Sequence, residues 1–462
     1  MPGKADSPTG ISSLKASLTP RGNWATHMGF ILAATGSAIG LGNIWKFPYI
    51  TGVYGGGAFV LVYLGCVVIV GLPLMLAELI VGRRAQENPV GAFQKLHREG
   101  SPWQLVGWLG VASGFVILSF YSVIGGWALA YVLKAIAGFA GTAEQIAAQF
   151  DHLSGSAGLS ILWHTVFMAL CVGIVAGGVQ SGIERWSRIL MPLLSAILLG
   201  LALYGLFATD GGTKALEFLF KPDFSKLSAL GVLSALGHAF FTLSLGMGAM
   251  ITYGSYMKRK EDLVRSAITI SILDTVIALM AGLAIFSIVF HYGLKEDAGI
   301  GLIFVTLPRL FAQMGQGVSI PFFVLLTFAA LTSAISLLEV VVSYFIDRRG
   351  WRRVPATLIM GGAIYVIGLL SAAAFIKVPG TDMGFFALLD DLSTNYMLPL
   401  GGLLTCLFVG WGMHRAARID ELGSSGLGYK LLVFCLRFLT PLAVFIVLLH
   451  GLELLPFMDY GN

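Results

Sequence analysis

The chain has 462 residues, of which 56% are hydrophobic and only 11% are charged, with 29 Lys and Arg against 24 Asp and Glu. A soluble protein has about 25% charged residues and divides into polar-surfaced domains of roughly 100–200 residues. This composition argues against a soluble enzyme and against a nucleic-acid-binding protein. It predicts an all-α polytopic membrane protein.

Eleven segments are apolar over about 20 residues, the length that crosses a bilayer. They lie at 24–53, 57–83, 104–139, 160–179, 187–208, 229–257, 263–292, 319–347, 354–377, 385–412 and 429–455. The stretch 299–320 is too interrupted to span, and we expect it to form an external re-entrant or capping loop that other parts of the protein cover.

Basic residues are distributed unevenly between alternate loops. With the N-terminus inside, 20 of the 29 Lys and Arg lie on the cytoplasmic side and seven lie outside, while Lys46 and Arg437 lie within spans. Cytoplasmic loops carry the excess of basic residues, so the sequence predicts a cytoplasmic N-terminus. Eleven spans then leave the C-terminus outside.

Two spans carry glycine clusters at the depth of the bilayer centre. The first reads Gly-Ser-Ala-Ile-Gly-Leu-Gly-Asn over 36–43, and the sixth reads Phe-Thr-Leu-Ser-Leu-Gly-Met-Gly over 241–248. One cluster alone would be explained by close packing of small residues between helices. Two clusters, each in the first span of a five-span unit, predict broken helices in two inverted halves, which mark the binding site of a transporter.

This reading divides the chain into five parts. They are a cytoplasmic tail over 1–23, a first five-helix repeat over 24–208, an extracellular loop over 209–228, a second five-helix repeat over 229–412, and a last part over 413–462 that holds a cytoplasmic loop, the eleventh helix and an external tail.

Several ordered motifs resemble the signature of the neurotransmitter:sodium symporter family. They are Gly-Ser-Ala-Ile-Gly-Leu-Gly-Asn-Ile-Trp-Lys-Phe-Pro over 36–48, Gly-Gly-Gly-Ala-Phe over 55–59, Gly-Leu-Pro-Leu-Met-Leu-Ala-Glu over 71–78, Phe-Phe-Thr-Leu-Ser-Leu-Gly-Met-Gly over 240–248 and Ala-Leu-Thr-Ser over 330–333. The resemblance covers 21–455 and is to the bacterial amino-acid branch in its eleven-span form. It implies the LeuT fold and a sodium-coupled symporter that imports amino acids by alternating access. No nucleophile–base constellation is present, so we expect no enzyme.

The resemblance implies a substrate site at the two breaks, in which backbone amides and a tyrosine hydroxyl hold the substrate carboxylate. The implied residues are Ser37, Ala38, Gly40, Leu41, Gly42, Ile117, Tyr121, Phe241, Thr242, Ser244, Met247, Ser333 and Leu337. Monoamine transporters place an Asp where this chain has Gly40, so the ligand should supply its own carboxylate, as an amino acid does. The flexible Met247 favours bulky hydrophobic or aromatic substrates, although a plain packing role explains it nearly as well.

The resemblance also implies two sodium ions. The first site would comprise Ala38, Asn43, Thr242 and Asp274 with the substrate carboxylate, and the second would comprise Gly36, Ile39, Ala329, Thr332 and Ser333. Without the family motif, the last two hydroxyls would be read as bonded within their own helix or to a neighbouring one. An acid in hydrocarbon needs a partner, and Asp274 is such an acid. Other members of the family have Asn at the matching position and the animal transporters need chloride nearby, so the resemblance implies that Asp274 supplies the negative charge and makes transport chloride-independent.

The same resemblance implies two gates. The outer gate would use Lys46, Tyr121, Phe241 and Asp390, and the inner gate would use Arg21, Trp24, Ser255, Tyr256, Glu339 and Asp347. Lys lacks the planar fork of Arg, so the Lys46–Asp390 pair should be loose. A snorkelling Lys and solvated acids are the alternative reading. Glu339 is expected to act in a network rather than on an ion, and Glu78 to be structural.

The alternative function is a non-transporting amino-acid sensor on the same fold, which would be expected to carry a large cytoplasmic output domain. We expect a multi-pass protein of the bacterial inner membrane whose partners are an amino acid and the lipid bilayer. The sequence leaves open the preferred amino acid, the sodium stoichiometry, proton counter-transport and the oligomeric state.

Overall fold

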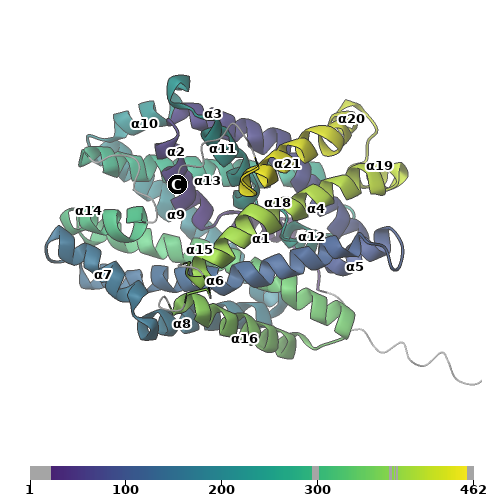
Figure 1. Cartoon of the computed structure of the whole chain (residues 1–462), viewed down its shortest axis with the longest axis horizontal. Helices are drawn as coiled ribbons and strands as arrows, with labels where there is room; N and C mark the ends of the chain where they lie inside the picture. The colour runs from purple at the N-terminus through teal and green to yellow at the C-terminus, as the bar shows by residue number, and fades with distance from the viewer. Residues whose placement is uncertain (1–21, 294–300, 374–376, 379, 381–382, 455–462) are drawn as a thin grey trace, which may run out of the picture.

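The computed structural model describes residues 22–293, 301–373, 377–378, 380 and 383–454. Within these ranges nearly all ordered elements are helices, and the only β-pairing is two isolated bridges. The long helices run roughly side by side along the longest axis of the molecule (Figure 1).

Nine of the helical runs in the described residues are long and apolar enough to cross a bilayer. Several continue through a short π-helical segment, labelled η. The runs are α3 (Gly57–Cys66) with η2 (Val67–Gly71) and α4 (Leu72–Ala85); α6 (Gln104–Ala137); α8 (Ala157–Ala176); η3 (Val179–Glu184) with α9 (Arg185–Ala208); α13 (Leu263–His291); α15 (Gln316–Arg349); α16 (Arg353–Ala372); α17 (Phe385–Asp391) with η6 (Leu392–Met397), α18 (Leu398–Leu407) and η7 (Phe408–Gly412); and α20 (Leu427–Phe434) with η8 (Cys435–Leu439) and α21 (Thr440–Gly451).

These bounds agree with the predicted spans to within a few residues, with one clear exception. The fifth span begins at Val179 rather than at 187, because η3 continues the helix through the polar residues Gln180, Ser181 and Glu184. A helix can carry such residues at a membrane edge where water and other chain segments satisfy them.

The two predicted breaks are confirmed. In the first span, α1 (His27–Ala38) ends where Ile39 takes an extended conformation, and the chain continues at a 51° bend into η1 (Gly42–Lys46) and α2 (Phe47–Val53). The sixth span is divided into α11 (Ala229–Thr242) and α12 (Ala249–Gly254), each too short to cross a membrane alone. The first break makes a tenth span among the described residues, and α11 with α12 lies where the sixth of the eleven predicted spans was expected.

Short helices cap the two ends of the bundle. At one end lie α7 (Ala143–Gly155), α10 (Gly212–Phe220) with the 3-10 turn η4 (Phe224–Lys226), and η5 (Leu302–Thr306) with α14 (Leu307–Met314); at the other lie α5 (Pro89–Leu96) and α19 (Arg415–Leu422) (Figure 1). We call these the Asp390 end and the Trp24 end. The predicted capping loop over 299–320 is therefore mostly helical, although its residues 299 and 300 lie outside the described part.

The core runs along the inner helices. In the most apolar stretches of α15 and α6, 78% and 72% of the residues are buried, whereas the value is 33% for α16 and for the α20–α21 run. Large apolar side chains on the outer helices are exposed, for example Phe207 and Phe445. Because lipid is as apolar as these side chains, such a surface is stable only in a bilayer. The inner helices are the ones that surround the two breaks.

Candidate functional site

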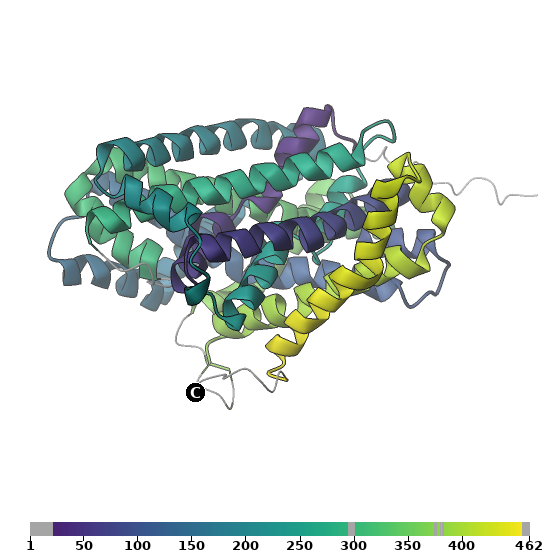
Figure 2. The same cartoon turned by 90° about the horizontal axis from the view of Figure 1, so that it is seen from above.

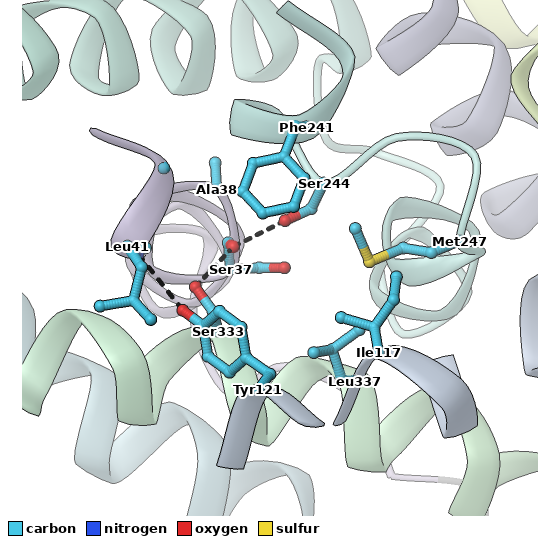
Figure 3. Close-up of a pocket in the computed structure, with 12 residues that line it drawn as sticks. Ser37, Ala38, Leu41, Ile117, Tyr121, Phe241, Ser244, Met247, Ser333 and Leu337 are labelled. Atoms are coloured by element: carbon cyan, nitrogen blue, oxygen red, sulfur yellow. Dashed lines mark hydrogen bonds between the residues drawn. The ribbon is translucent and has the colours of Figure 1, made fainter. Parts of the chain in front are cut away.

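The two breaks meet at the middle of the bundle. The Ser244 hydroxyl in the second break donates a hydrogen bond of 2.7 Å to the carbonyl of Ser37 in the first (Figure 3). From α15, the Ser333 hydroxyl donates to the same carbonyl at 3.1 Å and to that of Ile39 at 3.3 Å. The unwound end of α1 is therefore held between the second break and α15.

A cavity of about 30 Å³ lies at this meeting point. It is lined by Ser37, Ala38, Gly40, Leu41, Gly42, Ile117, Tyr121, Phe241, Ser244, Met247, Ser333 and Leu337. All 12 are among the 13 residues expected to contact substrate; Thr242 is the exception. In Figure 3 the cavity has a polar side near Tyr121, Ser333 and Leu41 and an apolar side formed by Ile117, Met247 and Leu337. A ligand with a charged head and an apolar side chain matches this division.

At Gly40, the backbone of the first break lies directly against the side-chain hydroxyl groups of Ser333 and Tyr121. A methyl group added at Gly40 would lie 2.6 Å from the Ser333 hydroxyl oxygen and 3.0 Å from that of Tyr121. The backbone N–H of Leu41 donates to the Tyr121 hydroxyl at 3.3 Å. Backbone N–H groups at the start of a helical segment attract anions, and here η1 begins at Gly42. The polar side of the cavity is thus suited to a carboxylate.

Asp274 is fully buried beside the first break. Its carboxylate accepts hydrogen bonds from the Asn43 amide at 2.8 Å, from the Thr242 hydroxyl at 3.1 Å and from the Tyr63 hydroxyl at 3.4 Å. No basic side chain of the described residues forms a salt bridge with it. A buried carboxylate among neutral donors is costly unless a cation or a proton neutralises it.

The residues of the expected second sodium site also lie together. The Ser333 hydroxyl contacts the Ile39 carbonyl, and a methyl group added at Gly36 would lie 3.2 Å from the Thr332 Cβ. The Thr332 hydroxyl donates back to its own helix, at 3.0 Å to Phe328 and 3.1 Å to the Ala329 carbonyl. The end of α1 and the middle of α15 therefore present carbonyl and hydroxyl oxygens to each other.

Glu78 holds the second break in shape. Its Oε1 atom accepts a 2.7 Å hydrogen bond from the backbone N–H of Gly246. Ser244, Gly246 and Gly248 have φ values of 53°, 82° and 74°, in the left-handed region that favours glycine. A methyl group at Gly246 would also lie 2.2 Å from the Leu398 carbonyl oxygen. Glycine is therefore required at Gly246, and Glu78 contacts the break directly.

At the Asp390 end, Lys46 and Asp390 do not form a salt bridge in this conformation. Lys46 instead places its Nζ 4.8 Å from the centre of the Phe241 ring, a cation–π contact. Asp390 accepts a 3.3 Å hydrogen bond from the Thr394 hydroxyl on its own helix. The loose pair of Lys46 and Asp390 stays a prediction. The two opposite charges attract each other without direct contact, as a single ammonium group without a planar fork allows.

At the Trp24 end, the start of the first span is closed by an aromatic cluster. Trp24 is 1% exposed; its indole N–H donates to the Tyr253 carbonyl at 3.0 Å, and its backbone N–H donates to the Tyr256 carbonyl at 3.2 Å. The Tyr256 hydroxyl donates to Glu339 at 2.6 Å. Glu339 in turn pairs with Arg353 through two hydrogen bonds of 2.7 and 2.8 Å. This network links the start of the first span to α12, α15 and the start of α16.

The other residues of the expected inner gate are placed as follows. Asp347 accepts a 2.8 Å hydrogen bond from the backbone N–H of Asn88, at the start of α5. Ser255 donates to the Thr252 carbonyl within its own turn. Arg21 lies outside the described residues.

Comparisons with known proteins identify the family of the chain. The model of the family described as "Sodium:neurotransmitter symporter family" matches residues 21–143 and 138–462 of this chain. The chain belongs to this family. An uncharacterized sodium-dependent transporter, YhdH of Bacillus subtilis, is 39% identical over 445 residues, which cover 94% of this chain and 98% of the relative. A second uncharacterized sodium-dependent transporter, from Haemophilus influenzae, is 31% identical over 451 residues with the same two coverages.

A solved structure of the bacterial transporter MhsT, in complex with L-phenylalanine, superposes with a TM-score of 0.86 at 44% identity and covers 93% of this chain and 100% of that one. The fold is therefore the LeuT fold, an inverted five-plus-five repeat with an added helix. The family consists of transporters, and the chain is a multi-span membrane protein, as the sequence predicted.

The donor set suits the ion that this symporter family uses. Among the described residues no group of three or more His, Cys, Asp or Glu side chains lies close enough to bind a metal ion. The two expected sodium sites instead offer carbonyl, hydroxyl, amide and single carboxylate oxygens. Hard oxygen donors suit an alkali cation and do not favour a transition metal.

Two contacts of buried acids at the Trp24 end were not predicted from the sequence. Glu184, 2% exposed, accepts hydrogen bonds from the backbone N–H groups of Ala25 at 2.7 Å and Thr26 at 3.2 Å, and so caps α1 from another helix. Arg353, counted only as a loop charge, is the partner of Glu339. The Glu184 contact has one signal in the sequence: Gly29, where a methyl group would lie 2.0 Å from the carboxylate.

Proposed function

We propose that the protein is a sodium-coupled symporter that imports amino acids, preferably hydrophobic or aromatic L-amino acids, by alternating access. The observation that carries this proposal is the cavity between the two breaks, with its polar side at the first break and its apolar side at Ile117, Met247 and Leu337. The binding of L-phenylalanine by the similar protein MhsT supports the substrate class.

The substrate carboxylate would bind the backbone N–H groups of Gly40, Leu41 and Gly42 together with the Tyr121 hydroxyl. The amino group would bind oxygens of Ala38, Thr242 and Ser244. No Asp occupies position 40, so the site has no fixed counter-charge for a ligand that lacks a carboxylate. An amine alone would therefore bind poorly.

Coupling would arise from a shared ligand. The substrate carboxylate completes a first sodium site with Ala38, Asn43, Thr242 and Asp274, so each of the two ligands binds poorly without the other. Asp274 supplies the negative charge, which makes chloride unnecessary. A second sodium ion would bind Gly36, Ile39, Ala329, Thr332 and Ser333 and fix the end of α1 against α15.

The network at the Trp24 end would be the inner gate and the Lys46 region the outer gate. The excess of basic residues in alternate loops supports a cytoplasmic Trp24 end in a bacterial inner membrane, an external C-terminus, and repeats over 24–208 and 229–412. An inward-negative potential then adds about 2.3 kcal/mol per elementary charge per 100 mV to the import of sodium.

The test is uptake of radiolabelled L-phenylalanine into proteoliposomes. We expect accumulation above the external concentration with an inward sodium gradient, no accumulation with potassium in its place, and unchanged uptake when gluconate replaces chloride. Binding without accumulation would instead indicate the amino-acid sensor, and uptake that collapses without chloride would refute the role of Asp274.

A competition screen of the amino acids, with and without sodium, tests the substrate class separately. We expect leucine, phenylalanine and tryptophan to displace the label in sodium only. A protein that binds glycine but neither leucine nor tryptophan would refute the proposed preference.

A further inference from the structure

A second cavity, of about 360 Å³, lies at the Trp24 end between α19 and the α20–η8 segment. Four of its lining residues are basic: Arg415, Arg418, Lys430 and Arg437. The amino-acid site lies at the middle of the bundle and shares none of these residues. Transport as proposed above therefore leaves the cavity unexplained.

The guanidinium groups of this cavity are held in place by backbone atoms. Arg418 is 3% exposed, and its Nη1 donates to the carbonyls of Val409 at 2.6 Å and Gly410 at 2.8 Å. Arg437 donates from Nε to the Gly410 carbonyl at 2.8 Å and stacks over the Trp411 ring at 4.6 Å. Neither group is neutralised by these contacts, since a carbonyl carries no net charge.

One donor of Arg418, which lines the cavity, has no partner. The Nε atom of Arg418 is buried and makes no hydrogen bond with any described residue. An unsatisfied buried donor on a charged group costs more than a neutral one, so a nearby anion would relieve it.

The two acids of α19 pair with arginines that do not line the cavity. Glu421 pairs with Arg83 at 2.7 Å, and Asp420 pairs with Arg84 at 2.7 Å. In the described part of the chain, none of the four basic residues of the cavity forms a salt bridge. The cavity therefore has four positive charges without a carboxylate to balance them.

The cavity borders a surface that faces lipid. Phe434 and Phe438, which line it, are 50% and 51% exposed, and Trp411 is 56% exposed. The α20–α21 run lies along one edge of the bundle (Figure 2), and α19 and α20 form its corner at the Trp24 end (Figure 1). An exposed tryptophan near the end of a span, such as Trp411, is typical of the membrane–water interface. A ligand here would have its charged part among arginines and its apolar part in the bilayer.

We propose that this cavity binds the phosphate headgroup of an anionic phospholipid from the leaflet at the Trp24 end. Arg418 and Arg437 donate to the phosphate oxygens, Arg415 and Lys430 add positive charge at the rim, and the acyl chains pack on Phe434 and Phe438. Arginine recognises phosphate with its planar fork, and basic pockets between spans are the sites that bind lipid headgroups.

The test measures binding of phosphatidylglycerol to the full-length purified protein by native mass spectrometry in detergent. The variant Arg415→Gln/Lys430→Gln removes two exposed charges and leaves the buried arginines in place. Each basic residue near a lipid surface contributes about fivefold to affinity, so this variant should bind phosphatidylglycerol about 30-fold more weakly than the wild type. The matched control, Arg349→Gln/Arg352→Gln, removes two exposed basic residues elsewhere at the same end and should bind as the wild type does.

Three results would overturn the proposal. The first is that the Arg415→Gln/Lys430→Gln variant binds phosphatidylglycerol as tightly as the wild type. An unchanged melting temperature in phosphatidylcholine serves as the control that this variant is folded. Phosphatidylcholine could bind the wild type as tightly as phosphatidylglycerol does. Soluble glycerol phosphate could displace the lipid at equal affinity, which would make the cavity a site for small anions. Failure of amino-acid transport would leave the proposal untouched, because lipid binding does not rest on it.

Discussion

The Asn43 amide donates a 2.8 Å hydrogen bond to the Asp274 carboxylate, and this contact joins the break in the first span to the middle of α13. The same amide donates at 3.2 Å to the Asp274 backbone carbonyl. The position of the unwound backbone is therefore coupled to the charge on one buried acid. Whatever neutralises Asp274 also acts on the segment that would hold the substrate.

Replacement of Asp274 with Asn should weaken sodium binding. The change keeps the size of the side chain but removes its charge and replaces one acceptor oxygen with an amide donor, so the sodium concentration for half-maximal L-phenylalanine binding should rise at least about tenfold, or about 1.4 kcal/mol. A sodium titration of ligand binding measures this. Asp420→Asn, at an exposed acid paired with Arg84, should leave the midpoint unchanged. Equal midpoints for Asp274→Asn and the wild type would contradict the assignment.

Replacement of Gly40 with Ala should block the carboxylate end of the cavity. Its methyl group would lie 2.6 Å from the Ser333 hydroxyl oxygen, so that hydroxyl or the first break must move. We expect affinity for L-phenylalanine to fall at least about tenfold, measured by scintillation proximity binding. The control is Gly237→Ala in α11, where a methyl group meets nothing within 4 Å and should stabilise the helix slightly. An equal loss of L-phenylalanine affinity in both variants would mean that any Gly→Ala change in these helices has the effect, and that contact at the carboxylate end of the cavity is not its cause.

Replacement of Glu339 with Gln should destabilise the Trp24 end. Glu339 is fully buried and pairs through two hydrogen bonds with Arg353, whose side chain is 23% exposed. Removal of one partner from a buried pair costs about 3 kcal/mol or more, and the access of water to Arg353 should reduce that cost. Thermal unfolding in detergent should show a clear loss of stability. The double variant Glu339→Gln/Arg353→Gln should recover part of it.

The pair of half-buried Arg84 and exposed Asp420 is the matched comparison for this experiment. Its loss in Asp420→Asn should change the stability little, since water screens the carboxylate. A cost for Glu339→Gln as small as that for Asp420→Asn would mean that the buried network does not hold this end closed.

The positions of the breaks could be predicted because they depend on local chemistry. Gly246 and Gly248 adopt φ values that other residues avoid, and such positions are visible in the sequence as glycines within apolar segments. The residues around the cavity followed from the family motifs, which keep their spacing along the chain. Their roles in binding remain predictions.

Contacts between distant helices could not be predicted in the same way. Glu184 caps the start of α1 at Ala25, which lies 159 residues earlier in the sequence. Only the packing of α9 against α1 brings these two residues together. Lys46 lies over Phe241 rather than on Asp390 because the choice between two partners depends on side-chain geometry at the Asp390 end. Neither a motif nor a hydropathy pattern records such choices.

Replacement of Met247 with Phe should change substrate selectivity. Met247 is 5% exposed and forms the apolar side of the cavity with Ile117 and Leu337. The flexible Met side chain can change its conformation to make room for a large substrate, whereas the rigid ring of Phe cannot. The affinity for tryptophan and phenylalanine should therefore fall about tenfold relative to that for leucine, or about 1.4 kcal/mol. Competition binding in sodium measures the ratio. Met250→Leu, at a buried methionine outside the cavity, should leave it unchanged. An unchanged ratio in Met247→Phe would mean that this methionine only fills space and that the size limit is set by Ile117 or Leu337.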